Sequence, residues 1–231
     1  MKQQPTIVFD LDGTLVDSAP DLIDALNVVI GKDGVAPIPL ETGRKFVGGG
    51  GRVLIRRALA TAGRDVSDGQ LEEMFAAFLA RYEANLSTKT LFYPGVERAL
   101  EKLAADGHVL AVCTNKFERP ARRLLTELGV SSRFAAIVGQ DTFPVSKPNG
   151  AVLRLTIEKA GGDPTCAIMV GDTITDVTTA KNADLPVVAV DFGYAPDPVA
   201  TYEPDRIIGH FDDLREAVRS LTGEIAKSAA V

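Results

Sequence analysis

Three aspartates lie close together near the start of the chain, in the segment IVFDLDGTLVDS that runs from Ile7 to Ser18. The apolar residues before Asp10 are typical of a buried strand, so Asp10 and Asp12 stand where that strand is expected to end. Carboxylates in such a place can act as nucleophiles, as acid–base groups or as ligands of a hard cation. The structural alternative is a turn that leads into a helix, for which Asp17 and Ser18 are suitable caps.

Further polar residues follow apolar runs later in the chain. Thr114 and Asn115 follow VLAVC, Lys147 lies in the loop PVSKPNG, and Asp172 and Asp176 lie in GDTITD after the run AIMV. Taken singly, each has an ordinary explanation, because helix caps, strand-end threonines and surface lysines are common. Ligands of an open α/β sheet bind beyond the carboxyl ends of its strands, so we expect the whole set to converge there.

The candidate metal ligands are Asp10, Asp12, Asp172 and Asp176. Two carboxylates about 4 Å apart repel each other by roughly 4 kcal/mol at an effective dielectric constant of 20, so the cluster would oppose folding without a cation. Mg²⁺ is the expected cofactor, because it prefers oxygen ligands and is held by one or two carboxylates together with substrate phosphate. Asp10 and Asp172 are expected to bind it directly, and Asp176, one helical turn after Asp172, through a water molecule.

The elements that must position these residues are predicted by short apolar runs separated by helical segments. The runs are TIVFD, VLAVCTN, AAIVG, AIMVGD and PVVAVD. Continuous apolar residues are typical of parallel strands buried on both faces, which predicts an α/β fold with a Rossmann-like parallel sheet. From about Pro20 to Leu91 the pattern is helical throughout. We therefore predict a core of residues 1–17 and 92–231, with a helical cap of residues 18–91 inserted after the first strand.

The composition is that of an ordinary soluble globular protein of 231 residues, with 45% hydrophobic residues. The formal charge of −6 argues against nucleic acid as a partner, because a phosphate backbone favours a basic surface. No apolar stretch is long enough for a signal peptide or a membrane span. Cys113 and Cys166 lie in apolar runs and are expected to be buried free thiols, which fits a cytoplasmic protein. We expect a monomer or a homodimer.

The ordered set of polar residues resembles the four motifs of the haloacid dehalogenase superfamily of phosphohydrolases. DLDGT matches the first motif, TN at Thr114 the second, KP at Lys147 the third and GDTITD the fourth. The segments FDLDGTLVDSAPDL, VGGGGRVLIRRAL, YPGV and LAVCTNK look like the bacterial phosphoglycolate phosphatases within that superfamily. The chain departs from the group at five positions. Asn149 and Gly150 stand where His-Pro is usual, and Thr173 and Thr175 stand where Ser and Asn are common. Asp184 stands where a glycine often ends the helix, a position in which aspartate tolerates a left-handed conformation.

The resemblance implies a mechanism. Asp10 would attack phosphorus and become an aspartyl phosphate, which divides one difficult displacement into two. Asp12 would protonate the leaving alkoxide and later deprotonate the attacking water. Thr114, Asn115 and Lys147 would bind the substrate, while Mg²⁺ bridges the nucleophile and the phosphate. A carboxylate beside Mg²⁺ stays ionised at neutral pH, so Asp10 could attack without a base.

The expected site has too little positive charge for an anionic substrate. Four aspartates, one Mg²⁺ and Lys147 give a net charge of −1 before a phosphate dianion enters. The predicted cap offers cations around the run Gly48 to Gly51, which is either a flexible loop or a segment that approaches the substrate closely. We predict that Lys45 and Arg52 bind the substrate, because an arginine fork suits a carboxylate.

The expected reaction is therefore Mg²⁺-dependent hydrolysis of a small phosphate monoester, with 2-phosphoglycolate giving glycolate and phosphate. One alternative is a phosphatase of another small or sugar phosphate, and a second is a sugar-phosphate mutase of the same superfamily. An alternative of a different class is a receiver-like regulator that binds phosphate without turnover. Release of inorganic phosphate from a simple ester would distinguish the regulator from the enzymes.

Overall fold

Six short strands build one sheet in the computed structural model, which describes residues 4–228. The strands are β1 (Thr6–Phe9), β4 (Leu110–Cys113), β5 (Ala136–Val138), β6 (Ala167–Gly171), β7 (Val187–Val190) and β8 (Arg206–Ile208). They are arranged in the order β5-β4-β1-β6-β7-β8, and every neighbouring pair is parallel. The predicted α/β fold class is confirmed, and the five predicted strands correspond to β1, β4, β5, β6 and β7.

Helices cover both faces of the sheet because successive side chains of each strand point in opposite directions. In β1, Ile7 and Phe9 pack into one hydrophobic cluster, and Val8 packs into another. The first cluster is covered by α5 (Val96–Ala105), α6 (Glu118–Glu127) and α9 (Leu214–Ser228), and the second by α7 (Gly150–Lys159) and α8 (Ile174–Asn182). Short 3₁₀ turns at Ser131–Arg133, Val199–Tyr202 and Phe211–Asp213 complete the connections.

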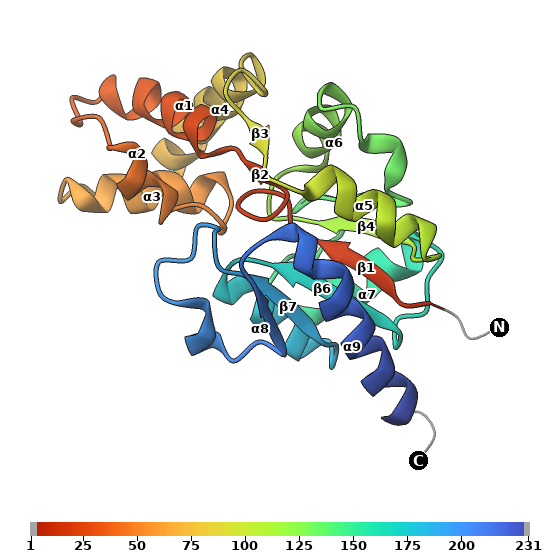
Figure 1. Cartoon of the computed structure of the whole chain (residues 1–231). Helices are drawn as coiled ribbons and strands as arrows, with labels where there is room; N and C mark the ends of the chain where they lie inside the picture. Colours follow the sequence, from red (N-terminus) through yellow and green to blue (C-terminus); the bar gives the residue numbers. More distant parts are fainter. Residues whose placement is uncertain (1–3, 229–231) are drawn as a thin grey trace.

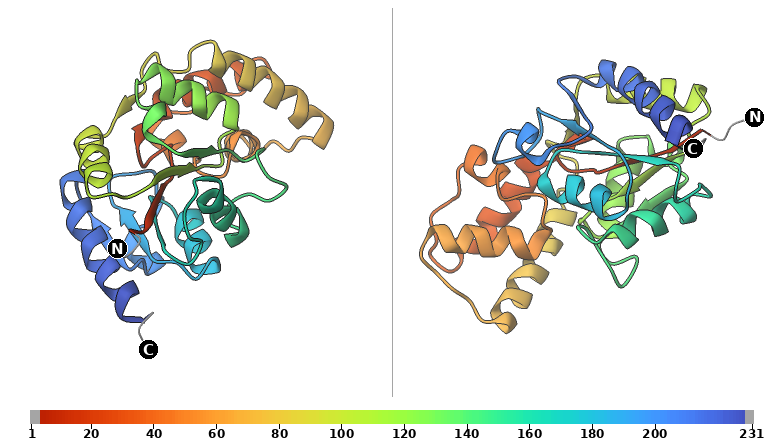
Figure 2. Two further views of the ribbon diagram at one scale, coloured as in Figure 1. Left: turned by 90° about the vertical axis from the view of Figure 1, so that its right-hand side faces the viewer. Right: turned by 90° about the horizontal axis from the view of Figure 1, so that it is seen from below.

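Four helices follow β1 in the sequence within residues 18–91, and we call these residues the cap. They are α1 (Ala19–Gly31), α2 (Leu40–Arg44), α3 (Gly51–Thr61) and α4 (Asp68–Glu83). Figures 1 and 2 show them as a group on one side of the sheet, beyond the end toward which β1 points. The chain enters and leaves this group through an antiparallel ribbon of β2 (Val16–Asp17) and β3 (Leu91–Phe92). Both predicted boundaries, at residues 17/18 and 91/92, fall at this ribbon.

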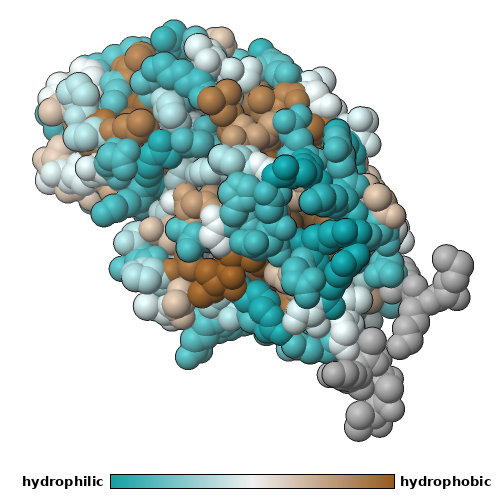
Figure 3. Space-filling view, in the orientation of Figure 1, coloured by the Kyte–Doolittle hydropathy of each residue, from teal (hydrophilic) through white to brown (hydrophobic). Residues whose placement is uncertain are grey.

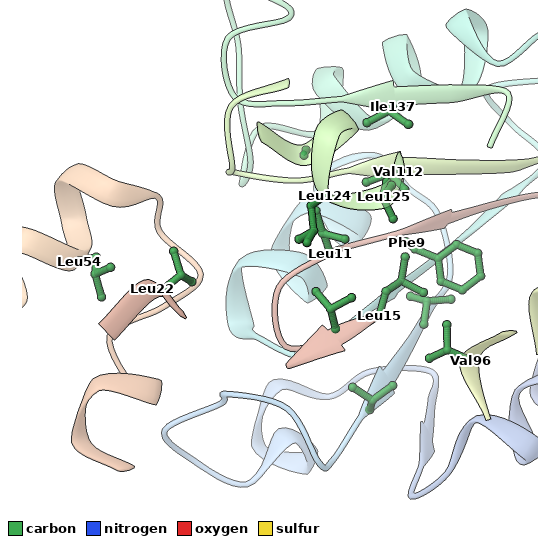
Figure 4. Close-up of a cluster of buried hydrophobic side chains, with 14 of the residues drawn as sticks. Phe9, Leu11, Leu15, Leu22, Leu54, Val96, Val112, Leu124, Leu125 and Ile137 are labelled. Atoms are coloured by element: carbon green, nitrogen blue, oxygen red, sulfur yellow. The ribbon is translucent and has the colours of Figure 1, made fainter. Parts of the chain in front are cut away.

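Apolar side chains fill the core beside the sheet and the space between the cap helices. Figure 4 shows Leu22 and Leu54 between the cap helices, apart from Phe9, Val112 and the other labelled side chains beside the sheet. Both cap leucines are almost fully buried, at 6% and 2% exposure. Burying such a side chain stabilises the fold by about 1.5–3 kcal/mol. Both leucines belong to the same hydrophobic cluster as Phe9, so apolar packing is continuous from the cap helices to the sheet.

Other features of the fold also bear on the predictions. Both cysteines are free, as expected, and Cys113 is buried, but Cys166 is only partly buried, contrary to the prediction. Asp184 has a φ of 55°, the left-handed conformation expected for it. Within residues 4–228, no helix combines the length and the hydrophobicity that are needed to cross a membrane. The face shown in Figure 3 is mostly hydrophilic, with small separate hydrophobic patches.

The edge strand β8 was not predicted. It has only three residues, and of these Arg206 and Ile207 are not buried. The opposite edge strand β5 is buried throughout and has a continuous apolar run, whereas β8 begins with two residues that are not buried and so lacks the run that identifies the other strands.

Candidate active site

The polar residues that follow the strands meet at one edge of the sheet. Asp10 follows β1, Thr114 follows β4 and Asp172 follows β6, and these three strands are neighbours in the order β4-β1-β6. Lys147 comes from the loop before α7, and Asp176 lies in the first turn of α8. All of these side chains are buried. The convergence follows from the parallel sheet, in which the carboxyl ends of neighbouring strands lie together.

Three carboxylates form a group that can hold a cation. Asp10, Asp172 and Asp176 each place one oxygen within 4.8 Å of the others. One oxygen of Asp172 accepts a bond from the hydroxyl of Thr14 (2.9 Å), and the other accepts from the backbone N–H of Tyr194 (2.7 Å). These ligands are hard oxygens in a buried position, a donor set that fits Mg²⁺. We call Asp10, Asp172 and Asp176 the carboxylate group.

Asp176 is held by more bonds than its two partners. Its Oδ2 accepts from the N–H groups of Asp172 (3.2 Å) and Thr173 (3.0 Å) and from the hydroxyl of Thr173 (2.8 Å), and its Oδ1 pairs with Lys147. Asp176 is the third residue of α8, so these contacts also cap the helix. This carboxylate is therefore firmly oriented toward the group.

Gly13 allows the loop after β1 to lie against Asp172. Its φ is +90°, and a Cβ at this position would lie 2.3 Å from Oδ2 of Asp172. Any side chain would clash with this oxygen and would also be strained in the backbone. The glycine of the DLDGT motif is therefore a steric requirement of the carboxylate group.

Lys147 compensates part of the negative charge. Its Nζ lies 2.8 Å from Oδ1 of Asp10 and 2.6 Å from Oδ1 of Asp176. Burial disfavours the charged lysine, but the two carboxylates outweigh this effect and raise the pKa of Lys147. In the protein alone, burial raises the pKa of Asp10 to about 6, against the opposing effect of Lys147. Burial and the neighbouring Asp176 and Asp10 also raise the pKa of Asp172 well above its ordinary value.

Asp12 lies beside the carboxylate group without being part of it. Its Oδ2 pairs with Nζ of Lys116 at 2.9 Å, and its Oδ1 accepts a bond from the hydroxyl of Ser18. The structure does not bring this carboxylate to the predicted metal ligands. Ser18 occupies the N-cap position of α1, as expected, but its hydroxyl bonds Asp12 and makes no capping bond.

Thr114 and Asn115 lie at the end of β4, where the core meets the cap. The hydroxyl of Thr114 accepts a bond from the N–H of Lys116 (3.2 Å), which leaves its own proton free to donate. The amide of Asn115 donates to the carbonyl of Gly48 in the cap (3.2 Å), and its Oδ1 is buried with no hydrogen-bond partner among the described residues. Both side chains therefore have hydrogen-bonding capacity left for a ligand.

The glycine run packs closely against the core. Gly48 and Gly50 have φ values of +106° and +87°, and a Cβ on Gly50 would lie 3.2 Å from the carbonyl oxygen of Asn115. A Cβ on Gly48 would lie 3.3 Å from the side chain of Thr173. Of the two interpretations of this run, the structure favours a close approach over a flexible loop.

Lys45 and Arg52 lie outside the group of site residues. The guanidinium of Arg52 makes two bonds of 2.6 Å to Glu72 and lies 3.9 Å from the ring centre of Phe75. Lys45 is exposed at the end of α2. Neither residue lines the cavity described next, so their predicted contact with substrate stays a prediction.

A small cavity extends from Asp10, the member of the carboxylate group that lines it, into the space between core and cap. Its volume is about 60 Å³, which is the space open to the centre of a water-sized sphere. Asp10, Asp12, Thr114, Asn115 and Lys116 line it from the core, and the cap contributes mainly apolar residues and glycines. Lys116 was missed in the sequence, although it directly follows the TN motif. A lysine at the end of a strand carries no local sign of burial.

Comparison with known proteins places this site in a family. A profile described as haloacid dehalogenase-like hydrolase matches residues 7–190. The chain belongs to this family. A phosphoglycolate phosphatase of Mesorhizobium japonicum is 46% identical over 211 residues, which cover 91% of this chain and 93% of the relative. A phosphoglycolate phosphatase of Agrobacterium fabrum is 42% identical, with 93% and 92% of the two chains covered.

Solved structures of haloacid dehalogenase-like proteins agree with the fold. A crystal structure described as a predicted phosphoglycolate phosphatase from Haemophilus somnus has a TM-score of 0.86 and 32% identity, and the match covers 94% of this chain and 99% of that one. The resemblance drawn from the four motifs is thereby confirmed. Because the match includes the cap as well as the core, the likeness extends to the element that covers the cavity.

Proposed function

We propose that the protein is a Mg²⁺-dependent phosphatase that hydrolyses 2-phosphoglycolate through an aspartyl-phosphate intermediate. The observation that carries the proposal is the buried carboxylate group with Lys147 beside it, of which Asp10 lines a cavity together with Asp12. A water molecule needs about 10–15 Å³ on the same measure, so a cavity of about 60 Å³ has room for the few atoms of a small ester between core and cap. The names of the relatives in Mesorhizobium and Agrobacterium support the same substrate.

The proposed first step is displacement at phosphorus. A carboxylate oxygen of Asp10 forms a bond to phosphorus while the bond from phosphorus to the glycolate oxygen breaks. Lys147 and Thr114 hold the oxygens of the phosphoryl group, since the one carries positive charge and the other has a free hydroxyl proton. Mg²⁺, bound by Asp10 and Asp172 with Asp176 behind them, would supply the charge that offsets phosphate and nucleophile.

Asp12 completes the two steps as the proton donor and acceptor. It gives a proton to the leaving glycolate oxygen, and in the second step it takes a proton from the water that attacks the aspartyl phosphate. That attack releases inorganic phosphate and restores Asp10. The hydroxyl of Ser18 and the ammonium of Lys116 fix the carboxylate of Asp12 from two sides, which keeps it near the leaving oxygen.

The proposal predicts phosphate release from 2-phosphoglycolate in the presence of Mg²⁺, and much weaker release from glucose 6-phosphate. Asp10→Asn should lower kcat by at least about 10³-fold, because the amide has the shape of the carboxylate but is not a nucleophile. A phosphate assay measures both effects, and circular dichroism checks that the variant is folded. Turnover near the wild-type level in Asp10→Asn would remove Asp10 from this role. Binding of phosphate without any turnover would favour the regulator instead.

A further inference from the structure

Lys116 is a buried cation for which the proposed reaction has no direct use. Its side chain is 6% exposed, and its only carboxylate partner among the described residues is Asp12, at 2.9 Å. Burial disfavours the ammonium form, but Asp12 outweighs this effect and raises the pKa of Lys116, so the charge is retained at neutral pH. A buried ion pair is a weak source of stability compared with apolar packing. Fixing Asp12 uses only one side of this ammonium, so the position of the charge calls for a further explanation.

The lining of the cavity indicates what this charge is placed to bind. Among the described residues that line it, Lys116 alone carries a positive charge. Its ammonium has three donors, one of which serves Asp12. Counting Lys116 also brings the net charge of the four aspartates, Mg²⁺ and Lys147 from −1 to zero. The site is then neutral before an anionic substrate enters.

Tyr82 of the cap adds an unused hydrogen-bonding group at the same place. Its ring centre lies 4.5 Å from Nζ of Lys116, and the residue lines the cavity. The residue is 2% exposed, and its hydroxyl lies close to the ammonium of Lys116, which can only donate, so the hydroxyl proton has no acceptor among residues 4–228. Burial raises the pKa of Tyr82 to about 12, so the hydroxyl keeps its proton at neutral pH. An unpaired buried hydroxyl is costly, and a ligand oxygen would satisfy it.

The start of α3 contributes a third favourable feature. Gly50 and Gly51 line the cavity, and no side chain caps this helix. The N–H groups of a first helical turn lack acceptors within the helix and attract anions. The cavity thus holds a lysine, a phenol and a helix N-terminus within its walls, all of which favour a second negative group on the substrate.

We propose that Lys116, assisted by the hydroxyl of Tyr82 and the N-terminus of α3, binds the carboxylate of the substrate and so determines its specificity. The inference rests on the proposed function. The carboxylate carbon of phosphoglycolate is two bonds from the oxygen that Asp12 protonates, and Lys116 is in direct contact with Asp12. A substrate placed for proton transfer therefore brings its carboxylate to Lys116. The guanidinium of Arg52, by contrast, is already hydrogen-bonded to both carboxylate oxygens of Glu72.

The test compares two esters that differ only at this end. Ethyl phosphate carries a methyl group where phosphoglycolate has its carboxylate, and both are assayed with Mg²⁺. In Lys116→Met, we expect the ratio of kcat/KM for phosphoglycolate to kcat/KM for ethyl phosphate to fall by at least about 30-fold, because a buried charge-assisted pair is lost. Asp12 serves both esters, so any effect that Lys116 has on catalysis through Asp12 lowers both values of kcat/KM and cancels in the ratio. Lys89→Met, at an exposed lysine of the cap that is paired with Asp24, makes the same chemical change away from the cavity and should keep the wild-type ratio.

A second variant covers the case in which Lys116→Met does not fold. Tyr82→Phe removes only a hydroxyl whose proton has no acceptor among the described residues, so it should fold normally and lower the ratio by several-fold. A wild-type ratio in both variants overturns the inference, as does a loss of the ratio in Arg52→Ala with none in Lys116→Met. A wild-type enzyme that does not prefer phosphoglycolate to ethyl phosphate overturns the proposed substrate, and this inference with it.

Discussion

Asp10 is placed where its charge is unfavourable until a cation is bound. Its pKa is raised from an ordinary 3.8 to about 6, chiefly by burial, and Lys147 offsets only part of this effect. The raised pKa means that folding disfavours the charged form, at a cost of roughly 3 kcal/mol above pH 6. The cost is relieved as the pH falls from about 6 toward 3.8, where the unfolded chain also takes up the proton. The metal-free protein should therefore carry strain at this residue at neutral pH.

Asp10→Asn should release this strain. With a chelator at pH 7.5, we expect the variant to exceed the wild type in free energy of unfolding by on the order of 1–3 kcal/mol. Lys147 keeps Asp176 as a partner in the variant, so no buried cation is left unpaired. Denaturant unfolding at pH 7.5 and at pH 5 measures the difference, which should shrink at the lower pH. A variant that is less stable than the wild type at pH 7.5 would contradict the argument.

At the scale of elements, the glycine run brings α3 against the ends of the strands. Gly50 adopts a positive φ and leaves no room for a side chain beside Asn115 and Gln140. Gly63, at the other end of α3, has a φ of +64° but nothing within 4 Å of its missing Cβ. The two glycines share the backbone requirement and differ in the closeness of their neighbours. Substituting each of them in turn therefore distinguishes the effect of backbone strain from the effect of the contact between cap and core.

Gly50→Ala should lower kcat/KM for every ester by at least about 10-fold, whereas Gly63→Ala should leave it close to the wild type. Both should lose about 1 kcal/mol or more of stability, because alanine is strained at positive φ. Steady-state kinetics and thermal unfolding of the two variants provide the comparison. Equal kinetic losses would mean that the cap is sensitive to strain alone and that the close approach at Gly50 has no part in catalysis.

The sequence predicts those features of the elements that depend on local pattern. The inner strands were recognisable because they are continuous apolar runs, and the residues after them were expected to converge because parallel strands end at one edge. The contacts of Lys116 with Asp12 and Tyr82 could not be predicted from such local patterns. Tyr82 lies on α4 of the cap and Asp12 on the loop after β1, and only the packing of cap on core brings them together. For the same reason Arg52, next to the glycine run, was expected at the substrate, although α4 supplies Glu72 as its partner.

At the scale of the whole molecule, hydrogen bonds connect the carboxylate group to the cap. The N–H of Tyr194 donates to Asp172, and its hydroxyl donates to Asp17 at 2.7 Å. Arg44 of the cap binds the same Asp17 through two bonds of 2.6 and 2.8 Å. Asp17 lies in the ribbon through which the chain enters the cap. A cation on Asp172 therefore stabilises an arrangement that includes β1, β6 and the base of the cap.

Mg²⁺ should accordingly stabilise the entire fold rather than one loop. The carboxylate group joins residues 10, 172 and 176, which only the folded chain brings within 4.8 Å of one another. At one hundred times its dissociation constant, a ligand bound only by the folded state adds about 2.7 kcal/mol, which for a chain of this length raises Tm by about 5–10 °C. Asp172→Asn should lose most of this Mg²⁺-induced rise, measured by thermal unfolding with and without Mg²⁺. Asp191→Asn is the matched control, because Asp191 follows the neighbouring strand β7 but is exposed, and its variant should show the full rise. An equal rise in both variants would show that Mg²⁺ binds elsewhere and that the carboxylate group is held together by Lys147 alone.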